Sequence, residues 1–449
     1  MNKKKKNLFL PIEFKYREFS SKLLLASFAL KAGFRVYVGS SNSIFRLIKS
    51  KSKKEGIFFF KGGLELELLV NLKKKCDHFV ILDEELGTLK NDYAKIARDR
   101  IWPDTEKYID RYYVIGKYGY EASYNIFPKM KNKIKCTGWP RVDLWRKEND
   151  HLFKKETELI NKKYGDFVLF SSDFGYNSNK IINQRLNDYK NSSWVTRKQY
   201  YIEKELAEKT FKDFNYFKKL LKDYDGIKGS PLIIIRPHPT DDLDAWINFS
   251  KELSNIKIVY EGEITPWINA SSGVVHRGCS AAIQAHMRGL PVGHFVSENA
   301  KIYETPYKIS KHIYSLKELI EFCKTSIRDN NVNIIKYHDE FKKMIYVKKD
   351  ELASELIVRD LLKLETKREF SFQTSFKNTF VDMYIYIRAI IKKFLIFFSI
   401  IEENLGTLSY SKKIPGGITE NEVKNFLYLL DSNQNSTVKK IFKDCIEID

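Results

Sequence analysis

Two short segments of the sequence place a cation and an imidazole directly after an apolar run. Residues 232–239 read L-I-I-I-R-P-H-P, and residues 274–291 read V-V-H-R-G-C-S-A-A-I-Q-A-H-M-R-G-L-P. Proline cannot continue a central strand, so the chain should leave the sheet carrying Arg236, His238 and Pro239. In open α/β sheets, ligands bind at such carboxyl ends of strands. The two segments together predict one site for a ligand that bears phosphate.

The second segment predicts a phosphate-binding turn between a strand and a helix. A hydroxyl at Ser280 and the backbone N–H groups that follow it suit an anion at a helix N-terminus. His276 and Arg277 could add contacts to the same ligand. The alternative interpretation is structural, with His238 capping a helix and His276 forming hydrogen bonds within a turn.

Carboxylates follow two predicted strands in the first part of the chain. Glu13 follows the first apolar run, and Asp83 and Glu84 follow a later one. Neighbouring carboxylates repel each other, so one of them can retain its proton to higher pH and serve as a general base. Lys15 and Arg17 could then bind an acidic group of a substrate. The alternative for Asp83 and Glu84 is a solvated helix start, where acidic residues are favourable.

The elements that must position these residues alternate between strand and helix, a pattern typical of parallel α/β sheets. The apolar runs predict two series of strands, at residues 7–12, 34–39, 57–60, 78–82, 112–115 and 134–137, and at residues 167–171, 232–235, 256–260, 273–275 and 291–295. We therefore predict an α/β fold with two Rossmann-like domains facing a cleft. The predicted domains are residues 1–148 on the acceptor side, 149–365 on the nucleotide side, and a helical extension at 366–449.

Composition narrows the possible partners and the cellular location. The 449 residues carry a formal net charge of +21, which suits an anionic substrate or surface but could also reflect biased composition. No nucleic-acid-binding motif is recognisable, so no nucleic-acid partner is expected. The five widely spaced cysteines indicate a reducing cytoplasm, and no metal cluster or cofactor motif is predicted. No signal peptide or membrane-spanning segment is predicted.

The stretch 380–401 is apolar and aromatic but is interrupted by three basic residues. Arg388 and Lys392 are four residues apart and Lys393 adjoins them, so they share one face of a helix. This pattern is typical of an interfacial helix that lies on an anionic membrane. A core or dimer helix with solvated basic residues is the equal alternative. The predicted location is therefore cytoplasmic, with possible peripheral attachment to the inner face of the membrane.

Several segments resemble the bacterial "surface carbohydrate biosynthesis protein" family over about residues 7–345. The matching stretches are L-P-I-E-F-K-Y-R-E-F at 10–19, L-D-E-E at 82–85, G-W-P-R-V-D at 138–143, F-S-S-D-F-G at 170–175, P-W-I at 266–268 and the segment 276–291. The R-P-H-P and serine segments are more distantly similar to two motifs of GT-B enzymes. Those enzymes are capsule Kdo transferases, bacterial sialyltransferases and teichoic-acid polyol-phosphate polymerases, in which the motifs hold a cytidine nucleotide.

The resemblance implies a glycosyltransferase of surface polysaccharide that needs no metal. It implies a CMP-linked donor of an acidic sugar, such as Kdo or another ulosonic acid, and a glycan or lipid-linked acceptor. His238 and Arg236 would then stabilise the departing phosphate. Two alternatives stay open: a transferase that uses CDP-polyol phosphate or a UDP- or GDP-sugar, and a non-catalytic scaffold of a polysaccharide assembly complex.

Overall fold

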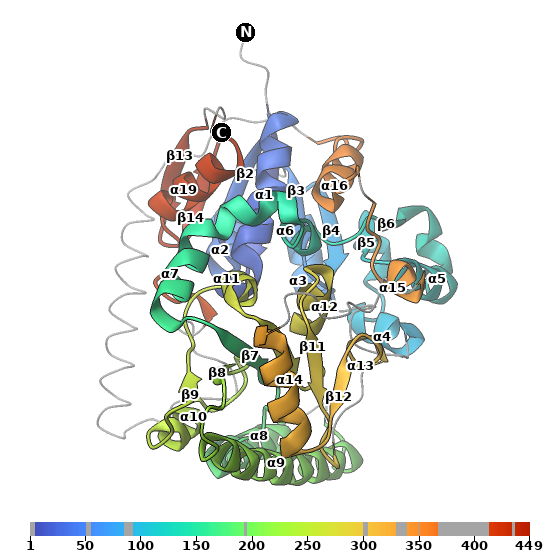
Figure 1. Ribbon diagram of the computed structural model, residues 1–449. Helices are drawn as coiled ribbons and strands as arrows, with labels where there is room; N and C mark the ends of the chain where they lie inside the picture. Colours follow the sequence, from blue (N-terminus) through green and yellow to red (C-terminus); the bar gives the residue numbers. More distant parts are fainter. Residues whose placement is uncertain are drawn as a thin grey trace, which may run out of the picture. The chain divides into compact units, whose positions relative to one another are not determined.

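The computed structural model describes residues 5–50, 55–84, 93–192, 195–299, 304–328, 339–348, 350–366, 413–432 and 436–449 (Figure 1). These residues form two compact units, each built around its own sheet. Unit 1 contains the described residues up to Leu144 and those from Asp339 onward. Unit 2 contains the described residues from Trp145 to 328.

Unit 1 is an eight-stranded sheet in the order β13-β14-β2-β1-β3-β4-β5-β6. The six strands from β2 to β6 in this order are parallel, as the apolar runs predicted. The strands are β1 (Lys6–Ile12), β2 (Phe34–Ser40), β3 (Ile57–Phe60), β4 (His78–Asp83), β5 (Arg111–Val114), β6 (Ile134–Cys136), β13 (Val438–Phe442) and β14 (Cys445–Ile448). The helices are α1 (Lys15–Lys31), α2 (Ser41–Ser50), α3 (Leu66–Lys73), α4 (Tyr93–Arg100), α5 (Lys117–Ile126), α6 (Pro140–Leu144), α15 (Asp339–Met344), α16 (Ala353–Leu361) and α19 (Glu420–Leu430).

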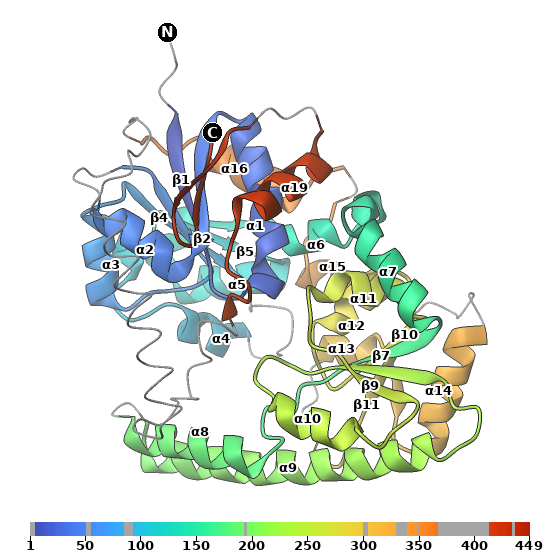
Figure 2. The same cartoon turned by 90° about the vertical axis from the view of Figure 1, so that its left-hand side faces the viewer.

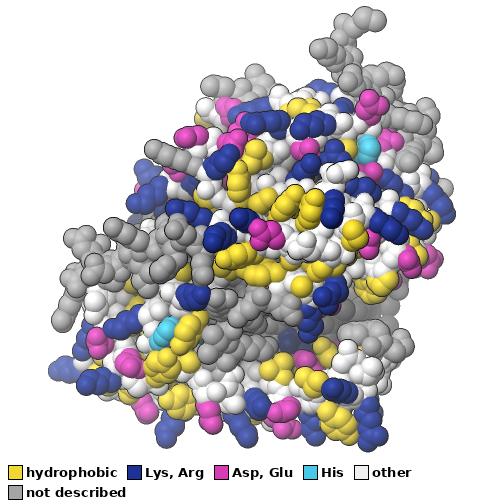
Figure 3. Space-filling view, turned by 90° about the vertical axis from the view of Figure 1, so that its right-hand side faces the viewer, with side chains coloured by type: hydrophobic (Ala, Val, Ile, Leu, Met, Phe, Trp, Pro, Cys, Tyr) yellow, Lys and Arg dark blue, Asp and Glu magenta, His cyan; other side chains and the backbone are white. Residues whose placement is uncertain are grey.

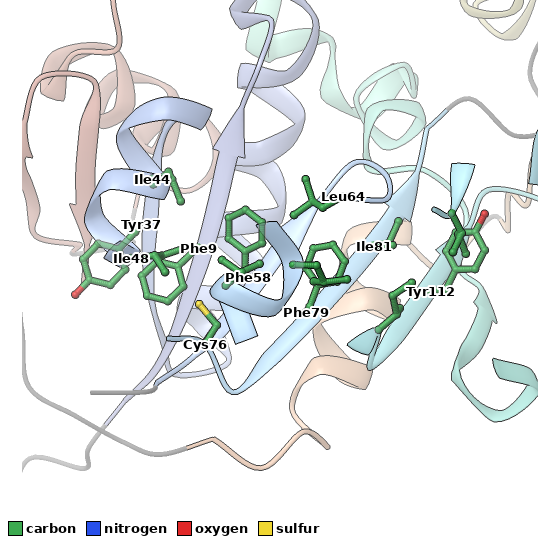
Figure 4. Close-up of a cluster of buried hydrophobic side chains, with 14 of the residues drawn as sticks. Phe9, Tyr37, Ile44, Ile48, Phe58, Leu64, Cys76, Phe79, Ile81 and Tyr112 are labelled. Carbon is green, nitrogen blue, oxygen red and sulfur yellow. The ribbon is translucent and has the colours of Figure 1, made fainter. Parts of the chain in front are cut away.

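A row of aromatic rings crosses one face of the unit 1 sheet (Figure 4). Tyr37, Phe9, Phe58 and Phe79 are direct neighbours in register on four adjacent strands, and all are fully buried. The rings of Phe9 and Tyr37 stack at 5.2 Å between centroids, and those of Phe58 and Phe79 at 6.0 Å. Such cross-strand pairs stabilise the sheet and fix its register. On unit 1, helix α1 packs against α6, α16 and α19.

The described C-terminal residues add two strands to the unit 1 sheet, where a helical extension was expected. Helix α19 is present, but β13 and β14 form a hairpin, and β14 pairs antiparallel with β2. Asp444, in the two-residue turn of this hairpin, has a φ of 55°, a conformation that Asp tolerates. Gly39 allows the turn to approach closely, because a Cβ atom there would lie 2.3 Å from the carbonyl oxygen of Asp444.

Unit 2 is a six-stranded, fully parallel sheet in the order β12-β11-β10-β7-β8-β9 (Figure 2). The strands are β7 (Phe167–Ser171), β8 (Leu232–Arg236), β9 (Ile256–Ile258), β10 (Gly273–His276), β11 (Val292–Phe295) and β12 (Lys311–Ile313). The helices are α7 (Lys154–Tyr164), α8 (Asn179–Asn191), α9 (Arg197–Asp225), α10 (Leu243–Ser250), α11 (Ile264–Ala270), α12 (Ala281–Met287), α13 (Glu304–Lys308) and α14 (Leu316–Arg328).

The long helix α9 begins at a capping box and covers the core of unit 2. Thr196 Oγ1 accepts the N–H of Gln199 at 3.2 Å, and Gln199 Oε1 accepts the N–H of Thr196 at 2.7 Å. Phe217 of α9 stacks on Phe170 of β7 at 4.4 Å between ring centroids. Trp246 of α10 is fully buried in the same cluster. The apolar stripe of α9 therefore shields the strands that carry the predicted phosphate site.

The α/β fold with two Rossmann-like sheets is confirmed. The division after Leu144 lies close to the predicted boundary at 148, but residues 339–366 belong to unit 1 rather than to the second domain. The interfacial helix expected at 380–401 lies outside the described residues. Among the helices that are described, none is both long and apolar enough to cross a bilayer.

Candidate functional site

The strand order of unit 1 reverses beside β1. The chain places β2 on one side of β1 and then crosses to place β3 on the other side. Ligands of open α/β sheets bind at the carboxyl ends of strands at such a reversal. Glu13 follows β1 and Lys61 follows β3, so these two side chains mark the favoured position in unit 1.

Acidic and basic side chains form a network of ion pairs at this reversal. Lys61 Nζ lies 2.8 Å from Glu13 Oε2 and 2.8 Å from Glu18 Oε1. Glu18 also accepts the backbone N–H groups of Glu13, at 2.8 Å, and Phe14, at 3.3 Å. Lys413 Nζ lies 3.1 Å from Glu13 Oε1. Burial opposes ionisation of Glu13, but the two lysines outweigh it, so the pKa of Glu13 lies below its usual value. Glu13 is therefore held as a carboxylate and is a weak base.

The two carboxylates at the end of β4 lie in different environments. Asp83 is fully buried, accepts the Tyr112 hydroxyl at 3.0 Å and lies 3.3 Å from Arg100 Nε. The Glu84 side chain is 14% exposed, and its Oε1 atom lies 3.9 Å from Lys22 Nζ. Burial raises the pKa of Glu84, although the nearby Lys22 partly opposes the rise. A carboxylate with a raised pKa and some solvent access is suited to general-base chemistry.

Lys15 is engaged inside unit 1 and does not support the prediction of a substrate-binding role. Its Nζ donates to the carbonyl oxygens of Pro415, at 3.3 Å, and Gly417, at 2.6 Å, and pairs with Glu422 at 2.5 Å. These three contacts use all three donors of an ammonium group. Arg17 is partly exposed and lies over the Phe14 ring at 6.0 Å from the centroid.

Three basic residues of this region were not among the predicted site residues. They are Lys22, Lys61 and Lys413. Lys22 is only 3% exposed and lies 4.7 Å from the centroid of the Phe59 ring, where burial lowers its pKa. The signal available in the sequence was a lysine within a largely apolar stretch, residues 19–31. Nothing local in the sequence connects Lys413 with Glu13.

The strand order of unit 2 reverses between β7 and β10, with β8 next to β7 on the other side. Hydrogen bonds connect the loops that follow these strands. Asp241 after β8 accepts the Ser172 hydroxyl and the Gly175 N–H, the latter at 2.7 Å. Cys279 after β10 donates its thiol to Ser171 Oγ at 3.2 Å. The predicted serine and His-Pro segments therefore reach the same edge of one sheet, beside its reversal.

The ring of His238 is oriented by the residue two positions later. Its Nδ1 accepts the Thr240 N–H at 3.3 Å and lies 2.7 Å from Thr240 Oγ1. An Nδ1 atom that accepts a hydrogen bond carries no proton, so the proton of the neutral ring is on Nε2. His238 is partly exposed, and Nε2–H can therefore act as a donor at the carboxyl edge of the sheet. The adjacent Pro239 is also partly exposed.

Ser280 is the other predicted residue that remains open to a ligand. It precedes helix α12, is partly exposed, and its side chain forms no capping hydrogen bond. The hydroxyl group can therefore donate elsewhere. Cys279 beside it is held by Ser171, and burial raises the pKa of its thiol, so it is a poor nucleophile.

Three other predicted ligand contacts are engaged within unit 2 by residues of their own surroundings. Arg236 donates to the carbonyl oxygens of Glu261 and Gly262, so it fastens the loop after β9. Arg277 is 6% exposed, pairs with Asp213 at 2.7 Å and lies over the Phe174 ring at 4.3 Å. His276 is fully buried, as described next. These side chains stabilise the loops at the carboxyl edge of the sheet.

Three histidines occupy neighbouring positions on the adjacent strands β10, β11 and β12. His276, His294 and His312 are direct partners in register. The rings of His276 and His294 stack at 4.7 Å, and Tyr307 stacks on His312 at 3.7 Å. His276 accepts the Gly278 N–H at Nδ1 and contacts Ser310 Oγ through Nε2, both at 2.8 Å. Burial, aided by the charges of His312 and Arg277, lowers the pKa of His294 to about 4, and burial also lowers the pKa of His276 well below its usual value.

We expect this histidine row to make the protein sensitive to acid. The unfolded chain binds protons near pH 6.5, whereas folded His294 does not until about pH 4. The neutral, buried His294 therefore contributes to the free energy of unfolding in full above pH 6.5. This contribution, up to about 3 kcal/mol, is lost as the pH falls toward 4. Urea unfolding between pH 7.5 and 4.5 measures it. His294→Phe should reduce the slope, whereas His151→Ala, at an exposed site, should keep it. Equal slopes in all three proteins would contradict the assignment.

Basic side chains are spread over the surface rather than gathered in a single patch on the face in Figure 3. Lys and Arg alternate there with acidic and apolar side chains. Within the described part of the chain, no group of three or more His, Cys, Asp or Glu residues has the geometry to hold a metal ion.

Comparison with known proteins identifies no family for this chain. No protein-family model matches it, and no curated protein matches it. Solved structures with a similar chain course include a UDP-N-acetylglucosamine 2-epimerase from Rickettsia bellii, at 10% identity and a TM-score of 0.45, covering 80% of this chain and 96% of that one. HepE from Anabaena in complex with UDP and glucose matches at 10% identity and a TM-score of 0.36, covering 79% and 95%. A variant of the wall teichoic acid polymerase TagF matches at 13% identity and a TM-score of 0.38, covering 80% and 89%.

Proposed function

We propose that this protein is a glycosyltransferase of surface-polysaccharide biosynthesis. It transfers an acidic sugar, such as Kdo or another ulosonic acid, from a CMP-linked donor to a glycan or lipid-linked acceptor. The observation that carries the proposal is that both Rossmann-like sheets gather candidate polar residues where their strand order reverses. One edge offers neutral hydrogen-bond donors for a phosphate, and the other offers a carboxylate suited to proton transfer.

The donor nucleotide is assigned to unit 2. Among the predicted residues described at that edge, His238 Nε2–H and the Ser280 hydroxyl are side-chain donors that can reach a phosphate. Donors that are already oriented stabilise the charge that develops on the departing phosphate. Neutral donors suffice for this role, so protonated His238 is not required. Arg236 and Arg277 act indirectly, by fixing the loops around the nucleotide.

The base is assigned to Glu84 of unit 1. Attack by an acceptor hydroxyl requires loss of its proton, and Glu84 combines a raised pKa with partial exposure. Asp83 is fully buried against Tyr112 and Arg100, and Glu13 is bound between two lysines. Both are therefore less suited to accept the proton.

A thermal-shift screen against CMP, CDP, UMP, UDP, GDP and AMP tests the donor assignment. A ligand that binds only the folded protein stabilises it and so raises its melting temperature. At a ligand concentration one hundred times the dissociation constant, the free energy of unfolding increases by about 2.7 kcal/mol. We expect CMP to give the largest shift, His238→Ala to abolish it, and His151→Ala to retain it.

The other outcomes of the screen separate the competing functions. A dominant shift with UDP or GDP would reject the CMP donor while retaining a nucleotide-sugar transferase. A shift with CDP alone would favour polyol-phosphate transfer. If none of the six nucleotides shifts the wild-type protein, the transferase assignment fails and the scaffold function takes its place.

A further inference from the structure

The carboxylate of Glu13 lies between two ammonium groups that come from distant parts of the chain. Its Oε2 atom is 2.8 Å from Lys61 Nζ, and its Oε1 atom is 3.1 Å from Lys413 Nζ. Both ammonium groups also lie over the Phe14 ring, at 5.1 and 5.2 Å from the centroid. The Glu13 side chain is 33% exposed, so solutes can reach this position.

The C-terminal segment that carries Lys413 is firmly attached to unit 1. Lys15 binds the carbonyl oxygens of Pro415 and Gly417, as described above. The Ile418 N–H donates to Asp444 Oδ1 at 2.7 Å, in the turn of the β13–β14 hairpin. The backbone beside Lys413 is therefore held in place on both the α1 side and the hairpin side.

Glu13 can leave the two lysines for water, because its side chain is 33% exposed. Ion pairs of partly exposed groups are worth about 1 kcal/mol, a cost that an external oxyanion binding to the same two cations can offset. Lys61 would keep its contact with Glu18 at 2.8 Å, so its ammonium group would remain in position. An external oxyanion would then meet two charged donors already oriented toward one point, and charge-assisted hydrogen bonds are the stronger kind.

We propose that Lys61 and Lys413 form an oxyanion-binding site that Glu13 occupies in the free protein and that a carboxylate or phosphate of the substrate takes over. The site lies at the strand reversal of unit 1, and the C-terminal segment completes it. The oxyanion site itself does not depend on the transfer reaction. Only the choice of probes rests on the proposed function, because an ulosonic sugar carries a carboxylate and lipid-linked acceptors carry phosphate.

Calorimetric titration of the full chain tests the site, with sodium pyrophosphate and a free ulosonic acid as separate probes at low salt. Glu13→Gln removes the competing carboxylate, so we expect at least one probe to bind about tenfold more tightly. Lys413→Met removes one of two cations, so binding should weaken about tenfold. Lys424→Met removes an exposed lysine of α19 and should leave binding unchanged. Circular dichroism verifies that each variant is folded.

Each outcome decides the proposal. Binding of pyrophosphate alone in the expected order assigns the site to phosphate, and binding of the ulosonic acid alone assigns it to the sugar carboxylate. Equal affinity in the wild type, Glu13→Gln and Lys413→Met overturns the site, as does the absence of binding of both probes to Glu13→Gln. The nucleotide screen reports on His238 independently. If the nucleotide screen refutes the transferase proposal, Glu13→Gln should still bind the anion more tightly than the wild type, and Lys413→Met more weakly. If the calorimetric titration refutes the oxyanion site, the result of the nucleotide screen is unaffected.

Discussion

Replacing Ile446 with alanine is expected to destabilise unit 1 by about 2–5 kcal/mol, the usual cost of such a cavity in a packed core. Ile446 is fully buried in β14, directly beside Val38 of β2. The hairpin it belongs to is formed by β13 and β14. If the hairpin is an integral part of the sheet, its buried residues should behave as core residues. Urea unfolding followed by circular dichroism measures the loss.

A matched variant on the same hairpin separates burial from strand pairing. Lys439 in β13 is exposed, so Lys439→Ala should change stability by no more than about 0.5 kcal/mol. A loss below about 1 kcal/mol for Ile446→Ala would show that the tail is a loosely attached extension. The result also bears on the oxyanion site, because Asp444 of this hairpin holds the segment that follows Lys413.

Replacing Glu84 with glutamine is expected to lower the rate of sugar transfer by about 10²–10⁴-fold, the usual contribution of a general base. Glutamine keeps the size of the side chain but cannot accept the proton. Because burial raises the pKa of Glu84, the wild-type rate should rise with pH through a value above the ordinary 4.5 of a glutamate. That rising limb should be absent in the variant. Steady-state rates from pH 4.5 to 8 provide the measurement.

Two further variants distinguish proton transfer from a structural effect. Lys22→Met removes the positive charge 3.9 Å from Glu84, so the rising limb should move to higher pH, because that charge holds the Glu84 pKa down. Glu65→Gln, at an exposed position before α3, should leave both rate and profile unchanged. Retention of more than half the wild-type rate by Glu84→Gln would refute the assignment of the base.

Local patterns were sufficient to predict strands β1 to β11 and the sheet edge at which the candidate residues gather, but not β12, β13 or β14. Buried parallel strands are short apolar runs, and the runs at 7–12 and 232–235 match β1 and β8 closely. The prolines after Arg236 correctly predicted where the chain leaves the sheet. Because parallel strands share one carboxyl edge, placing His238 and Ser280 on the same edge required no tertiary information.

The roles of individual side chains at that edge could not be predicted from the sequence. Arg236 and Arg277 match the residue types of a phosphate site, yet their partners are carbonyl oxygens of the loop after β9 and a carboxylate of α9. A buried guanidinium requires such partners, and which partners are near depends on packing between distant segments.

The sequence by itself determined the α/β class, the two series of parallel strands and the positions of the polar residues at their ends, because each of these depends on local periodicity and on proline. Only the tertiary structure decided that residues 438–448 extend the first sheet and that Lys413 reaches Glu13. Contacts between residues 400 positions apart depend on how whole elements pack, and no local pattern encodes such packing. The tertiary structure likewise distinguished Glu84 from Asp83, since Asp83 is fully buried against Tyr112 and Arg100 whereas Glu84 is partly exposed.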